Sequence, residues 1–247
     1  MDDGAHDTTV FAFNPNAHVE LVSIGRRGIK VCVIDDVLRD PEGVAALGFA
    51  QSYAEDSSNL YPGLRAAMPE RFSSAFRAWL TPMLQRHGVL ERNQTICRDT
   101  SFFSVVTTAS EDLLPIQCIP HYDSKDPNLF AAVIYLCGAR FSGTAFYRHR
   151  RTGYEEITED NVSNYKIALN SDLRTHGAPK RDYINGDTLL FETIFSTELQ
   201  FNRAIVYPAR ILHAAKIDSQ FHRPKDRSEW RLTVTALLLS ASVDRIT

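Results

Sequence analysis

His121 and Asp123 stand two positions apart in the stretch PHYDSKDPNLFAAVIYLC, where a short polar cluster precedes an apolar run. The segment before them, LLPIQCIPHYD, is apolar, and we expect a strand that ends at the pair. Residues two apart in a strand point to the same face, so an imidazole nitrogen and a carboxylate oxygen would converge on one point, as a divalent cation requires. The pair alone carries little weight, because a chain of this composition contains about one such pair by chance.

His213 supplies a third candidate ligand. It lies between two apolar segments in NRAIVYPARILHAAKI, after a turn at Pro208. Taken alone, it is better explained as a hydrogen-bonded histidine of the core or rim. Together with the pair upstream, it completes a set of two histidines and one carboxylate. Such a set on one face of an octahedron leaves three positions open, which is typical of non-haem Fe(II) oxygenases.

Arg231 opens the apolar segment RLTVTALLLS. An arginine at a strand end is often simply solvated. If this strand lies beside the one that carries His213, the guanidinium points into the same cavity, where its planar fork is suited to bind a carboxylate through two hydrogen bonds.

These residues need a scaffold, and the 247 residues suit one domain over 1–247. We expect a loose arm over 1–18, a strand with supporting helices over 19–100, and a β-structure over 101–240. Its short runs of β-branched and aromatic residues, bounded by turn residues, are typical of a sandwich or barrel. The polar segment 151–184 reads as a long excursion from that core, with a lid as one interpretation.

Two helices are predicted before residue 100. The first begins in DPEGVAALGFAQSYAE, with Asp40 as N-cap and Pro41 at the first helical position. The second covers PERFSSAFRAWLTPMLQRHG, where we expect Pro82 to interrupt the helix and Gly88 to follow its end.

Charge, cysteine content and the motifs that the sequence lacks argue against several classes of function. The net charge of −3 gives no general attraction to nucleic acid or to anionic membranes. The four scattered cysteines are expected to be reduced thiols, and the longest uncharged apolar run, LFAAVIYLCGA, is too short to span a bilayer. The N-terminus has no signal pattern, so we expect a cytoplasmic protein of unknown oligomeric state. No GxSxG, Walker, GxGxxG or HExxH motif occurs.

In their order, these motifs resemble the Fe(II)- and 2-oxoglutarate-dependent oxygenases, specifically the prolyl-4-hydroxylase-like branch. HYD, YPARILH and RLTVTALL correspond to that family's HxD pair, distal histidine and basic residue, and FSGTAFYRH after VIYLC is similar to its Gly-Gly-x-x-x-Phe-Tyr strand. The resemblance covers roughly residues 101–240. The sequence departs from the branch in two ways. The gap between His213 and Arg231 is longer, which leaves Arg223 and Arg227 as competing anchors for the co-substrate. Only one glycine of the double-glycine motif, Gly143, is present.

The resemblance implies a mainly β fold, a double-stranded β-helix (jelly-roll, cupin-like) core buttressed by the N-terminal helices. It also implies Fe(II) held by the HxD pair and the distal histidine, with 2-oxoglutarate as co-substrate and O2 as oxidant. The far carboxylate of 2-oxoglutarate would pair with Arg231, and Tyr147 or Tyr122 would contact the co-substrate. A carboxylate at Asp123, where halogenating relatives have a small residue, favours hydroxylation, or another oxidation, over halogenation. The substrate stays open among a peptidyl side chain, an amino acid and a small metabolite.

The basic segment YRHRRTG allows two interpretations. Arg148, Arg150 and Arg151 can form a solvated strand end and hairpin, or they can attract an acidic substrate, with Arg148 as an alternative anchor for 2-oxoglutarate. The other class of function is a non-catalytic β-sandwich or cupin-like module that binds a metal or ligand without turnover. The complete ligand set speaks against it, because a degenerate member has no need to keep all three residues.

Overall fold

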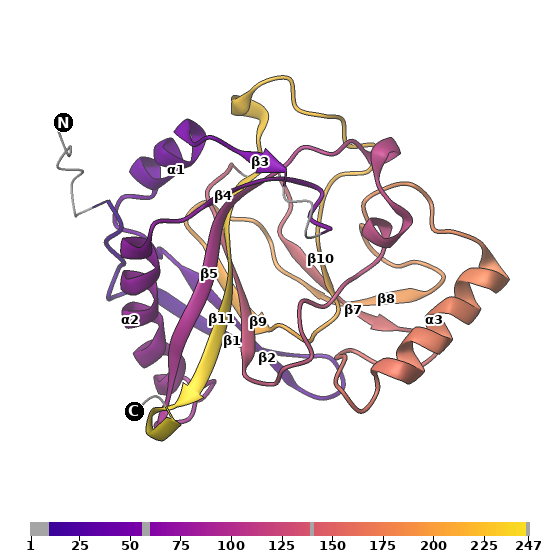
Figure 1. Ribbon diagram of the computed structural model, residues 1–247, viewed down its shortest axis with the longest axis horizontal. Coiled ribbons are helices and arrows are strands. Elements are labelled where there is room, and N and C mark those ends of the chain that lie inside the picture. Colours follow the sequence, from indigo (N-terminus) through magenta and orange to yellow (C-terminus); the bar gives the residue numbers. More distant parts are fainter. Residues whose placement is uncertain (1–9, 56–59, 139–140, 246–247) are drawn as a thin grey trace.

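The computed structural model describes residues 10–55, 60–138 and 141–245. In this part of the chain the strands form two antiparallel sheets that face each other (Figure 1). In order across the larger sheet, its 8 strands are β1 (His18–Ile24), β2 (Ile29–Asp35), β9 (Ala204–Pro208), β6 (Leu129–Tyr135), β11 (Leu232–Ser242), β5 (Gln94–Val106), β4 (Gly63–Ala67) and β3 (Ala54–Glu55). The smaller sheet has 3 strands, β10 (His213–Ala215), β7 (Thr144–His149) and β8 (Phe191–Ser196).

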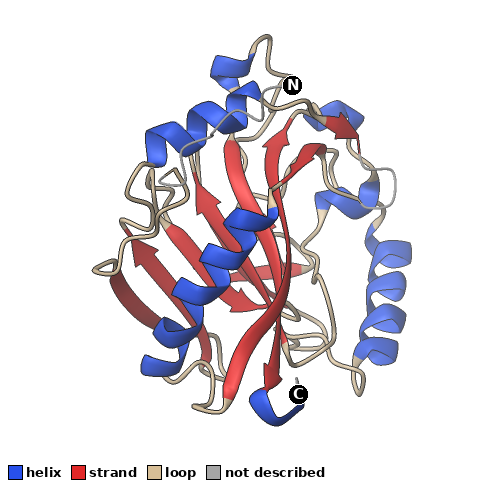
Figure 2. Cartoon of the chain, turned by 60° about the vertical axis from the view of Figure 1, so that its left-hand side comes forward, coloured by secondary structure: helices blue, strands red, loops and turns tan. Residues whose placement is uncertain are grey.

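Helices cover the outer faces of both sheets. The helices α1 (Pro41–Ala50) and α2 (Glu70–Arg86) lie against the larger sheet, and α3 (Val162–His176) lies against the smaller one (Figures 1 and 2). An aromatic cluster fixes α2: the rings of Phe13 and Phe76 stack with centroids 5.4 Å apart, and those of Phe11 and Phe72 meet edge to face at 5.6 Å. The mainly β fold with flanking helices is therefore confirmed.

The two predicted helices are present, with one difference. Asp40 caps α1 through a bond from the Gly43 amide to its Oδ1 (2.9 Å). Pro82 does not interrupt α2, which continues to Arg86. The interruption was expected because proline removes one backbone hydrogen bond and crowds the preceding turn. Burial of Leu80, Met83 and Leu84 on either side of the proline keeps the last turn helical.

Three other expectations need correction. The segment 113–119 is not a strand: the chain forms the short 3-10 helices η1 (Ser110–Asp112) and η2 (Pro115–Cys118) instead. Pro115 starts η2, and the Gln117 side chain accepts a hydrogen bond from the Leu114 amide at 2.8 Å. These local interactions favour a turn, although the apolar pattern of the segment predicts a strand.

The N-terminal arm is not loose over its described part, because Phe11 is buried and Phe13 pairs with Leu38. Residues 1–9 lie outside the described residues. The excursion 151–184 contains α3, whose Tyr165 and Leu169 are buried. That helix therefore packs on the smaller sheet. The lid interpretation does not apply to this part of the segment.

All four cysteines are thiols rather than disulfides, as expected. Among the described helices, none has both the length and the apolar character that a bilayer crossing requires.

The aromatic cluster yields the first prediction. Replacing Phe76, which is fully buried, with alanine should lower the free energy of unfolding by about 3–5 kcal/mol, because the ring leaves a cavity that the rigid helix–sheet interface cannot close. Ile167→Ala is the matched control, since this side chain is 70% exposed on α3 and should change stability by less than about 0.5 kcal/mol. Urea unfolding measures both values, and equal losses would contradict the role given to the cluster.

Candidate metal centre

A two-residue backbone bridge brings the candidate histidines together. His121 donates its amide to the His213 carbonyl (2.9 Å), and His213 donates to the His121 carbonyl (2.8 Å), which adds His121 to the edge of the smaller sheet. Directly opposed residues in an antiparallel pair point to the same face. The two imidazole rings accordingly lie with centroids 4.3 Å apart.

Asp123 joins the pair through a separate backbone contact. Its amide donates to the Ala209 carbonyl at 2.8 Å, which ties the loop after His121 to the turn before β10. Its carboxylate lies between the rings, with Oδ1 3.7 Å from Nε2 of His121 and Oδ2 3.5 Å from Nε2 of His213. One ligand atom from each residue lies within 4.8 Å of the other two, so the three side chains can share one metal ion.

The protonation states of the two imidazoles suit a cation. Nδ1 of His213 lies 2.9 Å from the Ile211 carbonyl, an acceptor, so this nitrogen carries the proton and Nε2 offers its lone pair toward Asp123. Desolvation at the site, and then the neighbouring His213, lower the pKa of His121 to about 4, against the opposing effect of Asp123. The side chain of His121 is nevertheless 55% exposed, so a neutral imidazole is open to an incoming ion.

Arg231 lies inside the sandwich, almost fully buried, where it precedes β11. Its Nη2 donates to the carbonyls of Ser142 (3.1 Å) and Gly143 (3.0 Å), and the guanidinium lies 5.6 Å from the ring centroid of Tyr135. Nη1 makes no hydrogen bond to any described residue. A buried cation whose Nη1 has no partner among the described residues is suited to an anionic ligand.

The buried Tyr207 lies beside His213. Its ring centroid is 4.8 Å from that of His213. Burial raises the pKa of Tyr207 well above its usual value, Asp123 raises it further, and Arg231 opposes the shift. The phenol therefore stays protonated and is a hydrogen-bond donor at the site.

Comparison with known proteins gives a family without a known activity. Residues 15–238 match the model of a family of unknown function, DUF6445. The chain belongs to this family. No curated protein matches this DUF6445 chain.

Several solved structures are similar to the DUF6445 chain at low identity. The non-heme alpha ketoglutarate dependent carbocyclase SnoK from nogalamycin biosynthesis is 11% identical, with 87% of this chain and 83% of that chain covered and a TM-score of 0.48. The epimerase SnoN from the same biosynthesis is 12% identical, with 87% and 82% covered and a TM-score of 0.47. HygX from Streptomyces hygroscopicus, with nickel and 2-oxoglutarate bound, is 10% identical, with 85% and 82% covered and a TM-score of 0.45.

Two expected cofactor contacts lie elsewhere in the DUF6445 chain. Tyr147 packs in the outer cluster between the smaller sheet and α3, not toward the histidines. Arg148 donates to Glu155 at 2.5 and 2.8 Å and to Glu192 at 2.8 Å, so its guanidinium is already compensated. Tyr122, the other tyrosine considered, packs edge to face on Tyr165 at 6.5 Å.

The remaining arginines of the basic segment also have acidic partners. Arg150 pairs with Asp187 (2.8 Å) and Arg151 with Asp172 (2.9 Å), so these two exposed arginines of the hairpin are compensated, while Arg148 is buried on β7. The competing anchors near the C-terminus lie outside the site as well. Arg227 is exposed and donates to the Phe49 carbonyl, and Arg223 is exposed.

Sequence reasoning missed one wall of the interior. Arg65 of β4 pairs in register with Ser104 of β5, which pairs with Thr233 of β11, which pairs with Tyr135 of β6. Residues in one such row share a face of the sheet, and Tyr135 points inward to Thr144, so all four face the smaller sheet. In RLTVT, polar residues alternate with apolar ones, and this pattern indicates a polar inner face. The 5 residues of β4 show no such pattern.

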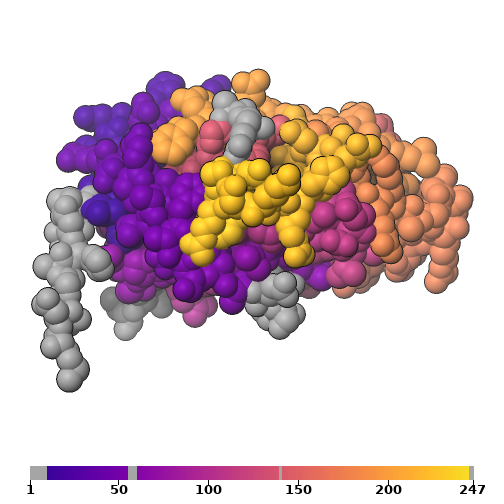
Figure 3. Space-filling model, turned by 90° about the horizontal axis from the view of Figure 1, so that it is seen from above, coloured from indigo at the N-terminus to yellow at the C-terminus, as the bar shows by residue number. Residues whose placement is uncertain are grey.

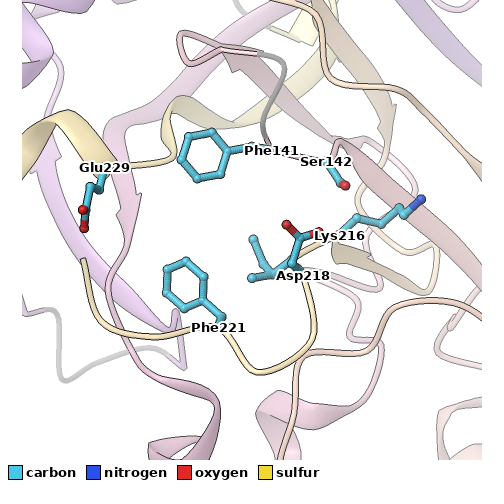
Figure 4. A pocket seen from close by; sticks show the side chains of 7 residues that line it. Phe141, Ser142, Lys216, Asp218, Phe221 and Glu229 are labelled. Atoms are coloured by element: carbon cyan, nitrogen blue, oxygen red, sulfur yellow. The ribbon is translucent and has the colours of Figure 1, made fainter. Parts of the chain in front are cut away.

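Loop 216–230 lies between β10 and Arg231, and several of its residues line a pocket of about 270 Å³. Figure 4 shows Phe141 and Phe221 on opposite sides of this pocket, with Asp218 toward its interior. The yellow C-terminal segment lies across this face of the molecule (Figure 3). The lining does not include the three candidate ligands, so the pocket is a neighbour of the centre and not the centre itself.

The ligand geometry gives the second prediction. His121→Ala and His213→Ala should each weaken Co(II) or Mn(II) binding by about 100-fold or more, since loss of a direct ligand exceeds the effect of losing an outer hydrogen-bond partner. His176→Ala is the matched control, because this histidine is exposed in the last turn of α3. Isothermal titration calorimetry measures the affinities. Unchanged binding in both site variants would disprove the centre.

Proposed function

We propose that this chain is a non-haem Fe(II)- and 2-oxoglutarate-dependent dioxygenase that hydroxylates an organic substrate. The observation that carries the proposal is the convergence of His121, Asp123 and His213, with one ligand atom of each within 4.8 Å of the others. This donor set suits Fe(II), and as a facial triad it leaves three positions for a chelating co-substrate and O2. A zinc site of the structural type is disfavoured, because no cysteine belongs to the set.

The order of strands supports a double-stranded β-helix core in a single domain. From β5 onward the chain passes from the larger sheet to the bridge at His121, back to the larger sheet at β6, and to the smaller sheet at β7 and β8. It then crosses to β9, to β10 and to β11, again between sheets. Such alternation builds a jelly-roll from two antiparallel sheets, with the ligands on the smaller sheet facing its interior.

The roles of the side chains follow from their positions. When bound, Fe(II) and 2-oxoglutarate supply the oxidation, in which 2-oxoglutarate and O2 give succinate and CO2 and one oxygen atom enters the substrate. The chain's part is to hold the metal on neutral imidazoles, orient His213 through the Ile211 carbonyl, and keep water from the buried side of the centre.

Arg231 is the proposed anchor for the far carboxylate of 2-oxoglutarate. Two carbonyls fix one edge of its guanidinium, which leaves Nη1 for a carboxylate oxygen. Tyr207 can donate to the same carboxylate, since its hydroxyl makes no hydrogen bond to a described residue. The long gap before Arg231 is the loop 216–230, so the spacing that departs from the prolyl-4-hydroxylase-like branch still leaves Arg231 directly before β11. Membership of that branch remains part of the proposal.

Spectroscopy tests the proposal before any substrate is known. Anaerobic addition of 2-oxoglutarate to the Fe(II) protein should produce a weak metal-to-ligand charge-transfer band, and admission of O2 should yield succinate. His121→Ala and His213→Ala should lose both signals while circular dichroism stays native. A wild-type protein that binds Fe(II) but gives neither band nor succinate would favour the alternative, a non-catalytic metal-binding module.

The anchor has its own prediction. Arg231→Ala should weaken 2-oxoglutarate binding to the Fe(II) protein by about 10- to 100-fold, because the charge-assisted hydrogen bond from Nη1 is lost. The affinity for Fe(II) alone should stay within about twofold, since Arg231 makes no contact with the three ligands. Arg227→Ala removes an exposed guanidinium from the neighbouring loop and serves as control. Titration of the charge-transfer band gives the values, and an unchanged affinity in Arg231→Ala would rule out the assignment.

A further inference from the structure

Arg65 lies on the inner wall of the larger sheet, in the same row as Ser104, Thr233 and Tyr135. The side chain therefore projects into the space between the sheets. On the outer face of the same strand, Ala66 is buried against the helices, as the alternation of a strand requires. The short strand β4 thus carries one cation into the interior.

The guanidinium of Arg65 is held by rings and not by acids. Its central carbon lies 4.4 Å from the ring centroid of Tyr61 and 5.4 Å from that of Phe102. Its Nε is buried and has no hydrogen-bond partner, and no carboxylate among the described residues pairs with it. A buried donor without a hydrogen-bond partner destabilises a fold by about 1–3 kcal/mol. A ligand that accepts a hydrogen bond from Nε would remove this penalty.

Arg65 lies near the strand that begins with His213. The ring of Tyr61, which the guanidinium of Arg65 covers, packs in one cluster with Ala215, two residues after His213 on β10. The inward row that begins at Arg65 ends at Tyr135, whose ring centroid lies 5.6 Å from the guanidinium of Arg231. Arg65 therefore faces the part of the interior that β10 and Arg231 border.

Charge balance separates the roles of the two arginines. With Fe(II) on Asp123 and a doubly charged 2-oxoglutarate, whose far carboxylate pairs with Arg231, the metal, Asp123, Arg231 and co-substrate are mutually neutral. The positive charge of Arg65 has no acidic partner among the described residues at a half-buried position, where its Nε is buried and an unpaired charge is unfavourable. The other interior arginine, Arg148, already has two carboxylate partners and needs no ligand.

We infer that Arg65 binds a carboxylate of the primary substrate beside the metal, and hence that the substrate is a carboxylic acid. The inference rests on the proposed function. The Nε edge of a guanidinium presents two parallel donors that match the two oxygens of a carboxylate. The rings of Tyr61 and Phe102 fix the plane of that fork before the ligand arrives, so little side-chain entropy is lost on binding.

The test measures binding rather than turnover. Zn(II)-loaded protein is saturated with N-oxalylglycine, an inert analogue of 2-oxoglutarate, and probed by ligand-observed NMR with N-acetyl amino acids and their carboxamides. Each pair differs only in the carboxylate. The acids should bind to wild type and their amides should not, and Arg65→Gln should weaken the acids by about 10-fold or more. Arg65→Lys keeps the charge without the fork and should fall between.

Controls separate the competing explanations. Arg92→Gln makes the same charge change in an exposed loop and should leave the acids unaffected. Thermal melting of each variant excludes unfolding as the cause. Equal binding of acids and amides, no binding of any acid, or full binding by Arg65→Gln would overturn the inference. A 10-fold loss of N-oxalylglycine affinity in Arg65→Gln would also overturn it, since Arg65 would then serve the co-substrate.

Failure of the proposed function has a different signature. In that case N-oxalylglycine does not bind even to the wild-type Zn(II) protein. The comparison of acids with amides is then made on the Zn(II) protein alone, where the same outcomes decide whether Arg65 is a carboxylate site.

Discussion

The reciprocal backbone bonds between His121 and His213 are the constraint on which the candidate centre depends. They make a strand of a single residue, yet they fix two side chains from distant segments on one face at 4.3 Å between ring centroids. Asp123 needs only one further bond, from its amide to Ala209, to place its carboxylate between the rings. Each bond contributes about 1 kcal/mol, so the centre gains its order from the sheets that frame it and not from the bridge alone.

The interior between the two sheets is divided by chemistry. One half is apolar, where Val31, Val33 and Ile205 of the larger sheet meet Phe146 of the smaller. The other half, under β11, β5 and β4, contains hydroxyl and guanidinium groups that are deeply or partly buried. A sandwich needs only the apolar half to be stable, because buried polar groups add little net free energy even when they are paired. The polar half is where the proposed co-substrate and substrate sites lie.

The proximity of the three candidate ligands could be predicted from the sequence, because their residue types and order are informative even where the predicted local structure is wrong. The segment before His121 is a 3-10 turn and not a strand, since Pro115 and Gln117 set a local cap. The pair still reaches the sheet through a single bridge. For β7, the sequence could not predict which side chains point into the sandwich. All residues of this strand are buried, because the sandwich lies on one side of it and α3 on the other. Without alternation in burial, nothing in the sequence separates Tyr147 from its inward neighbours.

Arginine roles were the least predictable feature, and electrostatics explains why. The role of an arginine depends on the groups that its guanidinium contacts. The partners of Arg148 come from a loop and from β8, and no sequence motif indicates them. Arg231 is compensated by backbone carbonyls, which have no sequence signature at all. Arg65 is compensated only by aromatic rings, which stabilise a cation by about 0.5–2 kcal/mol, less than the cost of removing it from water. Arg65 thus has no carboxylate or carbonyl partner among the described residues, whereas Arg148 and Arg231 each have such partners.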